Sequence, residues 1–263
     1  MWPKIWLLFA TYKRTAAALA TIESLGQFLK YPSVHFHICD DGSGETDDGT
    51  GRKHIEVLAN EAMQWFGDVT AHDMETPPGR FNTGGNINTG IRLAHDDGCD
   101  IHLLNFDDWA LLRELDVRPM VDVLDRYNEV GFIRLSYTVP GLAGLCVRYD
   151  DRTGGQMWLR LIRDWTLRNP WYTDSYMVST QPYIAHRRFF EAYGYHPENV
   201  TPGEAETGLG NLYNEAGNEN MPQILFPIGP RITHAPWGHI AARANDYARI
   251  SGMSMLERPD NVR

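Results

Sequence analysis

Two adjacent carboxylates, Asp107 and Asp108, follow an apolar run in the stretch 101–109, which reads IHLLNFDDW. Such a run is typical of a buried strand, and this one would deliver both acids to the edge of a sheet. In open α/β sheets, ligands bind beyond the carboxyl ends of the strands. Neighbouring side chains on a strand point to opposite faces, so two carboxylates that serve one cation need a turn here. Two acids in a solvated loop are the plainer alternative.

Two further polar stretches follow predicted strands and suit a nucleotide. Residues 40–43 read DDGS, in which Asp40 and Asp41 can accept hydrogen bonds from a base or a ribose beside a permissive glycine. Residues 80–90 read RFNTGGNINTG, in which Arg80 could meet phosphate ahead of a helix N-terminus, a natural anion site. The GK[ST] ending of a Walker loop is missing. A tight turn and a glycine-rich connector are the plainer alternatives.

Composition and charge narrow the class of protein. The chain of 263 residues is long enough for one elaborated domain or two closely packed ones. Its net charge of -10 argues against a generally basic nucleic-acid-binding surface, although a local basic groove stays open. The cysteines, Cys39, Cys99 and Cys146, are widely separated and odd in number, which fits neither a zinc pattern nor a disulfide framework and favours a reducing compartment.

The N-terminal run IWLLFA is too short to span a membrane and enters TYKR without a small-residue cleavage site. We therefore expect it to be a first strand, and we expect a cytoplasmic protein with no membrane span.

Strand and helix patterns alternate along the first half of the chain. A β-α-β-α-β-loop-α-β order of this kind predicts an α/β fold with a mainly parallel sheet covered on both faces. The predicted strands are 4–10, 34–40, 69–74 and 101–106, the helices are 15–29, 53–66 and 91–97, and an irregular loop is predicted over 76–90.

The second half is less regular. We predict a helix over 116–127, a strand over 131–137 and a strand followed by a helix over 181–194. The region 138–175 has no assigned element, and its aromatic side chains either stack on the rings of a ligand or form a small core of their own. These aromatics are Trp158, Trp165, Trp171 and Tyr172.

The order TYKR, DDGS, GGNINTGIRLA and LLNFDDW resembles the nucleotide-sugar glycosyltransferases of the GT-A fold. The resemblance is nearest to the large inverting family that includes cellulose and chitin synthases. It implies a Rossmann-like, mixed and mainly parallel sheet flanked by helices, in one domain over 1–263. Residues 1–112 would bind the nucleotide sugar, and residues 113–263 would form an elaborated acceptor-binding half.

The resemblance also implies roles for particular residues. Asp107 and Asp108 would hold a divalent ion, Mn²⁺ or Mg²⁺, on the donor diphosphate. The first acid of the family's DxD motif falls on Asn105, as in an EDDW variant with asparagine for glutamate, which leaves open which aspartate binds the metal. The residues that would contact the donor are Thr11, Tyr12, Arg14, Asp40, Asp41, Arg80, Gly85 and Asn88.

A general base is implied in the stretch 201–217, TPGEAETGLGNLYNEAG. In the family an acidic pair opens a helix that ends in a glycine, and its second acid takes the proton of the acceptor hydroxyl. Counting back from Gly217 puts Glu206 on the second position and Ala205 on the first, with Glu204 as a close competitor. Acids that merely cap a helix are the plainer alternative.

A late histidine on the metal is a further implication. The stretch RITHAPWGHI offers His234 and His239, and we expect His234 to be the ligand. Neutral imidazole suits Mn²⁺ beside carboxylate oxygens. Pro236 argues against a helix at this point.

The sequence thus predicts a metal-dependent, inverting glycosyltransferase that moves a sugar from a nucleotide-diphosphate sugar, with a UDP-sugar expected, to an acceptor hydroxyl. A catalytically silent nucleotide-sugar-binding module is the main alternative, because Asn105 and Ala205 replace acids. A modified nucleic-acid base as acceptor is disfavoured by the charge. A nucleotidyltransferase is a further alternative, but its glycine-rich entry loop after the first strand is missing here. A metal-dependent hydrolase is another, and it would act on phosphate esters without transferring a sugar.

Overall fold

The computed structural model of the chain describes residues 2–77, 80–135, 146–161, 182–216, 223–228 and 237–239. Two of the predicted features lie outside these ranges: His234, and the aromatics Trp165, Trp171 and Tyr172. Within the described ranges, no helix combines the length and the apolar character needed to cross a membrane.

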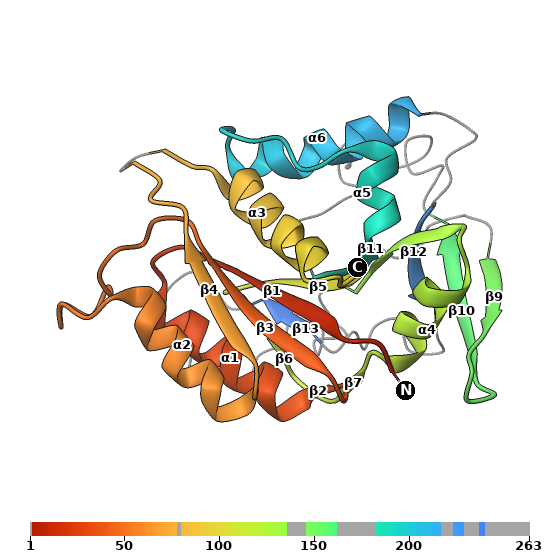
Figure 1. The fold of residues 1–263 in the computed structure, drawn as a ribbon, viewed down its shortest axis with the longest axis horizontal. Helices are drawn as coiled ribbons and strands as arrows, with labels where there is room; N and C mark the ends of the chain where they lie inside the picture. The colour runs from red at the N-terminus through yellow and green to blue at the C-terminus, as the bar shows by residue number, and fades with distance from the viewer. Residues whose placement is uncertain are drawn as a thin grey trace, which may run out of the picture.

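One mixed sheet runs through the described part of the molecule (Figure 1). Its nine strands are β1 (Ile5–Thr11), β3 (Val34–Asp40), β4 (Val69–Asp73), β5 (Ile101–Phe106), β8 (Val130–Arg134), β9 (Cys146–Asp150), β10 (Gln156–Leu161), β11 (Tyr183–His186) and β12 (Gln223–Ile228). Their order is β4-β3-β1-β5-β11-β8-β12-β10-β9. The four strands from β4 to β5 are parallel, and β11 lies antiparallel between β5 and β8. The predicted mixed α/β sheet is confirmed, with its long parallel part in the first half of the chain.

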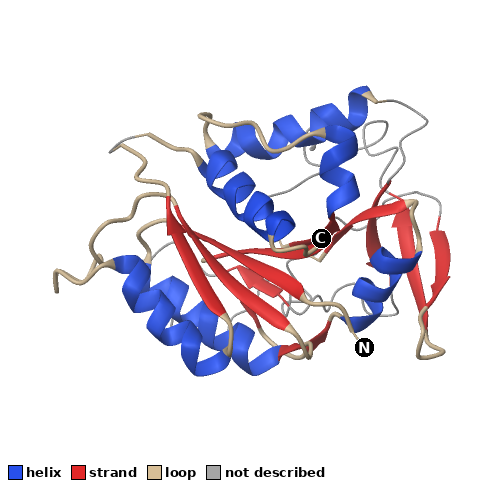
Figure 2. Cartoon of the chain, viewed as in Figure 1, coloured by secondary structure: helices blue, strands red, loops and turns tan. Residues whose placement is uncertain are grey.

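Helices cover both faces of the sheet (Figure 2). On one face α1 (Thr15–Phe28) packs beside α2 (His54–Trp65), and the apolar side of α4 (Arg118–Arg126) joins the same core. On the other face lie α3 (Thr83–Asp96), α5 (Arg187–Tyr193) and α6 (Pro202–Glu215). Two short pairs complete the described elements: β2 (Leu29–Lys30) with β7 (Leu115–Asp116), and β6 (Trp109–Leu111) with β13 (Trp237–His239).

Strand β1 shows why the N-terminal apolar run has no alternation in its polarity. Successive side chains of a strand point to opposite faces, and both faces here are covered by helices. Residues Ile5, Leu7 and Phe9 pack with α1, α2 and α4, while Trp6 and Leu8 pack with α3 and α5.

The predicted irregular loop over 76–90 is wrong for residues 83–90, which form the first half of α3. Asn82 caps this helix, because its side-chain oxygen accepts from the backbone N of Gly85 at 3.3 Å. The glycines serve close packing rather than loop freedom. A methyl group added at Gly84 would collide with the carbonyl oxygen of Pro197, and one at Gly90 would lie 2.8 Å from the sulfur of Cys39.

The other helix and strand predictions are confirmed within a few residues. The helix predicted at 116–127 is α4, the strand at 131–137 begins with β8, and the strand–helix step at 181–194 is β11 followed by α5. The unassigned region contains the antiparallel pair β9–β10, on which Trp158 is 48% exposed.

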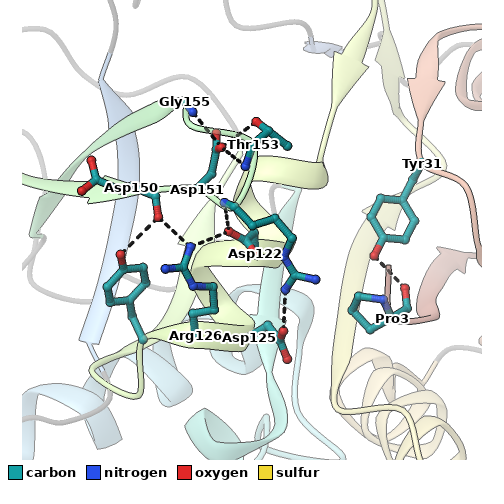
Figure 3. A network of polar contacts seen from close by, with 11 residues as sticks. Pro3, Tyr31, Asp122, Asp125, Arg126, Asp150, Asp151, Thr153 and Gly155 are labelled. Carbon is teal, nitrogen blue, oxygen red and sulfur yellow. Dashed lines mark hydrogen bonds and ion pairs between the residues drawn. The ribbon is translucent and has the colours of Figure 1, made fainter. Parts of the chain in front are cut away.

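A buried carboxylate fastens the β9–β10 hairpin to α4 (Figure 3). Asp122 on α4 has no exposed surface and accepts from the Arg126 guanidinium at 3.2 Å and from the backbone N of Arg152 at 2.6 Å. The guanidinium of Arg152 also pairs with Asp122 and donates to Asp125 at 2.8 Å. Arg126 in turn donates to the carbonyl oxygen of Asp150 at 3.0 Å. A buried charge that is paired and hydrogen-bonded in this way fixes the hairpin in one position.

Several histidines are buried or half-buried in their neutral form. Burial lowers the pKa of His37, His54, His72, His95, His102, His186 and His196. Each of these groups binds a proton more readily in the unfolded chain than in the folded one. Stability from these groups is therefore present near neutral pH and is lost as the pH falls below the ordinary histidine value of about 6.5.

His186 offers a clean test of this pH dependence. Burial, and then the charge of Arg188, lower its pKa to about 4, and its ring accepts from the backbone N of Arg188 at the start of α5. His186→Asn keeps a helix-capping acceptor but cannot take up a proton. We expect the thermal midpoint of the variant to fall less than that of the wild type between about pH 7 and pH 5. Thermal unfolding by circular dichroism across that range measures it, and parallel curves for the two proteins would contradict it.

Candidate active site

The predicted site residues gather at one edge of the sheet. The parallel strands β1, β3, β4 and β5 end there at Thr11, Asp40, Asp73 and Phe106. Thr11 pairs in register with Asp40, and Asp40 pairs with Asp73. The loops that follow these strands therefore meet, as expected for the carboxyl edge of an open α/β sheet.

Asp107 is the centre of the hydrogen bonds that join the ends of β1 and β5. Its side chain is fully buried. Its Oδ2 accepts from the hydroxyl of Thr11 at 3.1 Å and from the backbone N of Tyr12 at 3.2 Å. Its carbonyl oxygen accepts from the hydroxyl of Thr21 on α1 at 2.9 Å. Asp107 and Asp108 form the turn between β5 and β6, so the predicted turn after this strand is present.

Arg14 joins the two aspartates. Its Nη1 donates to Oδ2 of Asp108 at 2.8 Å, and its Nη2 pairs with Oδ1 of Asp107. Burial raises the pKa of Asp107 to about 7, against the opposing charge of Arg14. Burial by itself would lower the pKa of Arg14, but the charges of Asp107 and Asp108 outweigh it and raise that pKa. A cation is thus held between two carboxylates at a strand end, and the Asp108 side chain remains 16% exposed.

Asn105, which takes the place of the family's first acid, holds this turn together. It is fully buried on β5, and its amide nitrogen donates to the carbonyl oxygens of Trp109 at 2.9 Å and of Phe106 at 3.2 Å. A carboxylate cannot donate these bonds. Asparagine at this position therefore has a structural role that an acid could not fill.

The second strand end forms a compact turn. Asp40 is buried, and its Oδ1 accepts from the backbone N of Ser43 at 3.2 Å and from the Ser43 hydroxyl. That hydroxyl oxygen also accepts from the backbone N of Lys13 at 2.7 Å, which ties the turn to the loop after β1. Burial raises the pKa of Asp40 to about 6. Gly42 has φ +81 and packs against the backbone of Thr76, so only glycine fits there.

Asp41 organises the loop between β4 and α3. Its carboxylate accepts from the hydroxyl of Thr76 at 2.6 Å and from the backbone N of Asn82 at 3.2 Å. The side-chain oxygen of Asn82 accepts in turn from the backbone N of Asn199 at 2.8 Å. A short chain of hydrogen bonds therefore links the end of β3 to the segment that precedes α6.

A cavity of about 560 Å³ lies beside this chain, within the usual range for a ligand pocket. One wall is the loop after β4, including Thr76 and Arg80, and the other is the segment that enters α6, including Thr201. The structure therefore places Arg80 on a cavity next to the Asp41 turn.

Three non-glycine residues of the described ranges have a left-handed backbone, and all three lie in loops at this edge. They are Lys13 with φ 58, Glu75 with φ 49 and Asn199 with φ 57. Such conformations cost free energy and concentrate where the surrounding structure must hold a functional shape.

Two predicted donor contacts, Gly85 and Asn88, are buried within α3. The Asn88 side chain donates to the carbonyl oxygen of His196 at 2.8 Å and to Glu198 at 2.9 Å, and it accepts from the backbone N of His196 at 3.1 Å. It therefore anchors the segment before α6, and its contact with a nucleotide stays a prediction.

The two candidate bases occupy different positions on α6. Glu204 closes a capping box, because its carboxylate accepts from the backbone N of Thr201 at 2.9 Å and from the Thr201 hydroxyl at 2.7 Å. Glu206 lies two residues further along the helix. The sequence pattern T-x-x-E before the helix is the signal that identifies the capping acid.

His54 was not among the predicted site residues. It is fully buried, and its ring nitrogens contact the hydroxyls of Thr11 at 3.0 Å and Thr15 at 2.9 Å. It thus orients the hydroxyl that donates to Asp107. In a chain with ten histidines, nothing local in the sequence distinguishes this one.

The sheet order and the helices on its two faces define the GT-A type of glycosyltransferase fold. No family model and no curated protein matches the sequence. The similarity of this chain to known proteins is therefore one of structure alone. The observed fold agrees with the fold that the sequence resemblance implied.

Solved structures with this fold include TarS of S. aureus and a mycobacterial enzyme. TarS 1–349 matches with a TM-score of 0.56 and 13% sequence identity, and the match covers 97% of this chain and 66% of that one. The complex of TarS 1–349 with UDP matches with a TM-score of 0.55 and 12% sequence identity. Glucosyl-3-phosphoglycerate synthase from Mycobacterium tuberculosis, in complex with Mn²⁺, UDP-glucose and phosphoglyceric acid, matches with a TM-score of 0.53 and 16% sequence identity. The match covers 96% of this chain and 77% of that one. The chain spans 40% of a longer TarS structure.

The role of Asn105 can be tested by restoring the acid. We expect Asn105→Asp to lower the free energy of unfolding by about 1–3 kcal/mol, because two carbonyl oxygens lose their donor and a carboxylate is buried. Urea unfolding at pH 7 measures the change. The exposed Asn60→Asp on α2 is the matched control, with an expected effect within about 0.5 kcal/mol. Equal stability of the two variants would contradict the assignment.

Proposed function

We propose that the protein is a glycosyltransferase that uses a nucleotide-diphosphate sugar, with a UDP-sugar as the expected donor. The observation that carries the proposal is the cluster of Asp107, Asp108 and Arg14, which ties the ends of β1 and β5 together at the carboxyl edge of a GT-A-type sheet. Two solved structures of similar fold contain UDP or UDP-glucose, which supports the choice of donor.

The donor groups of this cluster fit a divalent ion such as Mn²⁺ or Mg²⁺. Both ions prefer carboxylate oxygens, and two carboxylates lie next to each other here. Arg14 pairs with both carboxylates in this structure, so a divalent ion held there would replace its contacts with Asp107 and Asp108 and leave its guanidinium available to the phosphates. Asp107 and Asp108 would hold the ion, with His234 as a further candidate. A bound ion would offset the charge that develops on the leaving diphosphate.

The chain's own groups would bind the rest of the donor. Asp40 has a buried carboxylate oxygen, Oδ2, that has no partner among the described residues and is able to accept from a base or a ribose. Thr11 and Tyr12 lie in the adjacent loop. The planar guanidinium of Arg14, and that of Arg80 on the cavity, match phosphate oxygens. Asp41 would act by holding the loop that carries Arg80.

The acceptor would enter from the side of α6. The cavity lies between Arg80 and Thr201, so it joins the proposed donor loop to the start of this helix. Glu206 would take the proton of the acceptor hydroxyl as that oxygen attacks the anomeric carbon in line with the leaving group, which inverts the configuration. Glu204 is already engaged in the cap, and this favours Glu206 as the base.

A silent nucleotide-sugar-binding module is the second candidate, because Asn105 is committed to the turn and Ala205 is buried. A thermal-shift screen with UDP-, GDP- and dTDP-sugars, with and without Mn²⁺, tests donor binding. A ligand at a hundredfold excess over its Kd adds about 2.7 kcal/mol of stability. Protection together with sugar transfer or hydrolysis supports the enzyme, and protection without turnover supports the module. Absence of protection by every nucleotide sugar overturns both.

The metal assignment predicts a specific loss. Changing Asp107 and Asp108 together to Asn should abolish the Mn²⁺-dependent protection by UDP, because the oxygen ligands lose their charge. The matched control is Asp100→Asn, an exposed carboxylate next to the opposite end of β5, which should keep that protection. Circular dichroism checks that both proteins fold. Metal-dependent protection that survives in the double variant would exclude these ligands.

The two glutamates of α6 should behave differently. We expect Glu206→Gln to keep donor affinity and to lower turnover by about a hundredfold or more. Glu204→Gln removes only part of a helix cap, so it should change stability by about 1 kcal/mol or less and leave most of the turnover. Transfer rates and UDP affinity are measured for both. Inactivation by Glu204→Gln alone would exchange the two roles, and full activity of both variants would place the base elsewhere.

A further inference from the structure

A second group of metal-binding side chains lies on the sheet face covered by α3. His37 and Cys39 are two residues apart on β3 and so share one face, and His72 on the neighbouring strand β4 pairs in register with Cys39. One ligand atom from each of the three lies within 4.8 Å of the others. None of these residues belongs to the carboxylate cluster of the candidate active site.

The two imidazoles face each other across a short distance. Nε2 of His37 lies 2.7 Å from Nδ1 of His72. Burial lowers the pKa of both rings, that of His37 to about 3, so both are neutral near pH 7. Two neutral nitrogens at this distance share one proton. A metal ion bound by both would replace that proton, which moves to Nε2 of the neutral His72 ring.

An outer chain of hydrogen bonds orients His37. Nδ1 of His35 lies 2.7 Å from the Asp68 carboxylate, and Nε2 of His35 lies 2.6 Å from Oγ1 of Thr70. The same Oγ1 lies 2.6 Å from Nδ1 of His37. The Asp68 carboxylate accepts from Nδ1 of His35. In the arrangement in which the Thr70 hydroxyl donates to Nε2 of His35 and accepts from Nδ1 of His37, a lone pair on Nε2 of His37 faces His72. Metal-binding histidines are oriented by such contacts through their second nitrogen.

Helix α3 leaves space for the thiol. Cys39 is fully buried, and the residue above it is Gly90. A Cβ at Gly90 would lie 2.8 Å from the Cys39 sulfur and 3.6 Å from the His37 ring. Among the described strands β4 is the last of the sheet at this end, and His72 is only partly buried, so an ion would reach the site from this side.

We propose that His37, Cys39 and His72 bind one borderline-soft transition-metal ion, and Zn²⁺ is the expected ion. The bound ion would tie the edge strand β4 to β3, next to Asp40 at the end of β3. Two imidazoles and a thiolate suit Zn²⁺, whereas Mn²⁺ and Mg²⁺ prefer the oxygens of the carboxylate cluster. Burial, and then the charge of Asp40, raise the pKa of the Cys39 thiol, so the metal–sulfur bond must supply the free energy for the loss of its proton to solvent. The inference does not depend on the proposed glycosyl transfer.

Co²⁺ is the probe, because a cobalt–thiolate bond gives a charge-transfer band in the near ultraviolet. We expect the full chain to bind one equivalent of Co²⁺ with this band, and Zn²⁺ to displace it. Cys39→Ser should lose the band. His72→Asn, a change on the edge strand that is expected to fold, should weaken binding at least about a hundredfold, since even changes behind the ligands cost about 10–100-fold.

The controls separate this site from others. Cys99→Ser removes the other described free thiol, and His95→Ala removes a half-buried imidazole of α3. Both should keep the band and the affinity, as should the double variant of Asp107 and Asp108. Zn²⁺ should raise the Tm of the wild type but not that of His72→Asn. Absence of the band in the wild type, or full binding by His72→Asn, overturns the proposal.

Discussion

The site depends on the burial of one carboxylate at the end of a strand. Asp107 has no exposed surface, and burial disfavours its charged form, while Arg14, the Thr11 hydroxyl and the Tyr12 amide all face the carboxyl group and oppose that penalty. These contacts fix the ends of β1 and β5 relative to each other. Asn105 then closes the turn from behind, through bonds that an acid could not make. The carboxyl edge of the sheet is therefore shaped by electrostatic compensation before any ligand binds.

The parts of the fold that follow from local pattern could be predicted from the sequence. Apolar runs predict the strands β1 and β5, and the spacing of apolar residues predicts the helices α1 and α2. The order of these elements then indicates which strand ends meet. Glycine misled the prediction at the start of α3. Whether Gly84 gives freedom or close packing depends on Pro197, more than a hundred residues later in the chain.

The same distinction applies to the individual site residues. The Thr201–Glu204 capping box is a local pattern and is readable in the sequence. The roles of Asn88 and His54 are not, because each is defined by partners from distant segments. The β9–β10 pair escaped prediction for a related reason: a buried ion pair at Asp122 positions it, in a stretch without clear periodicity.

Asn82 has a consequence for attempts to redesign the protein. Its backbone N donates to Asp41, and its side-chain oxygen accepts from both Gly85 and Asn199. One residue thus connects the turn after β3, the start of α3 and the approach to α6. The loop 76–83 cannot be exchanged as an independent module, because a graft that lacks this amide would also release the segment leading into α6. The turn after β3, the start of α3 and the segment leading into α6 are therefore mechanically coupled, and a change in one must be engineered together with the others.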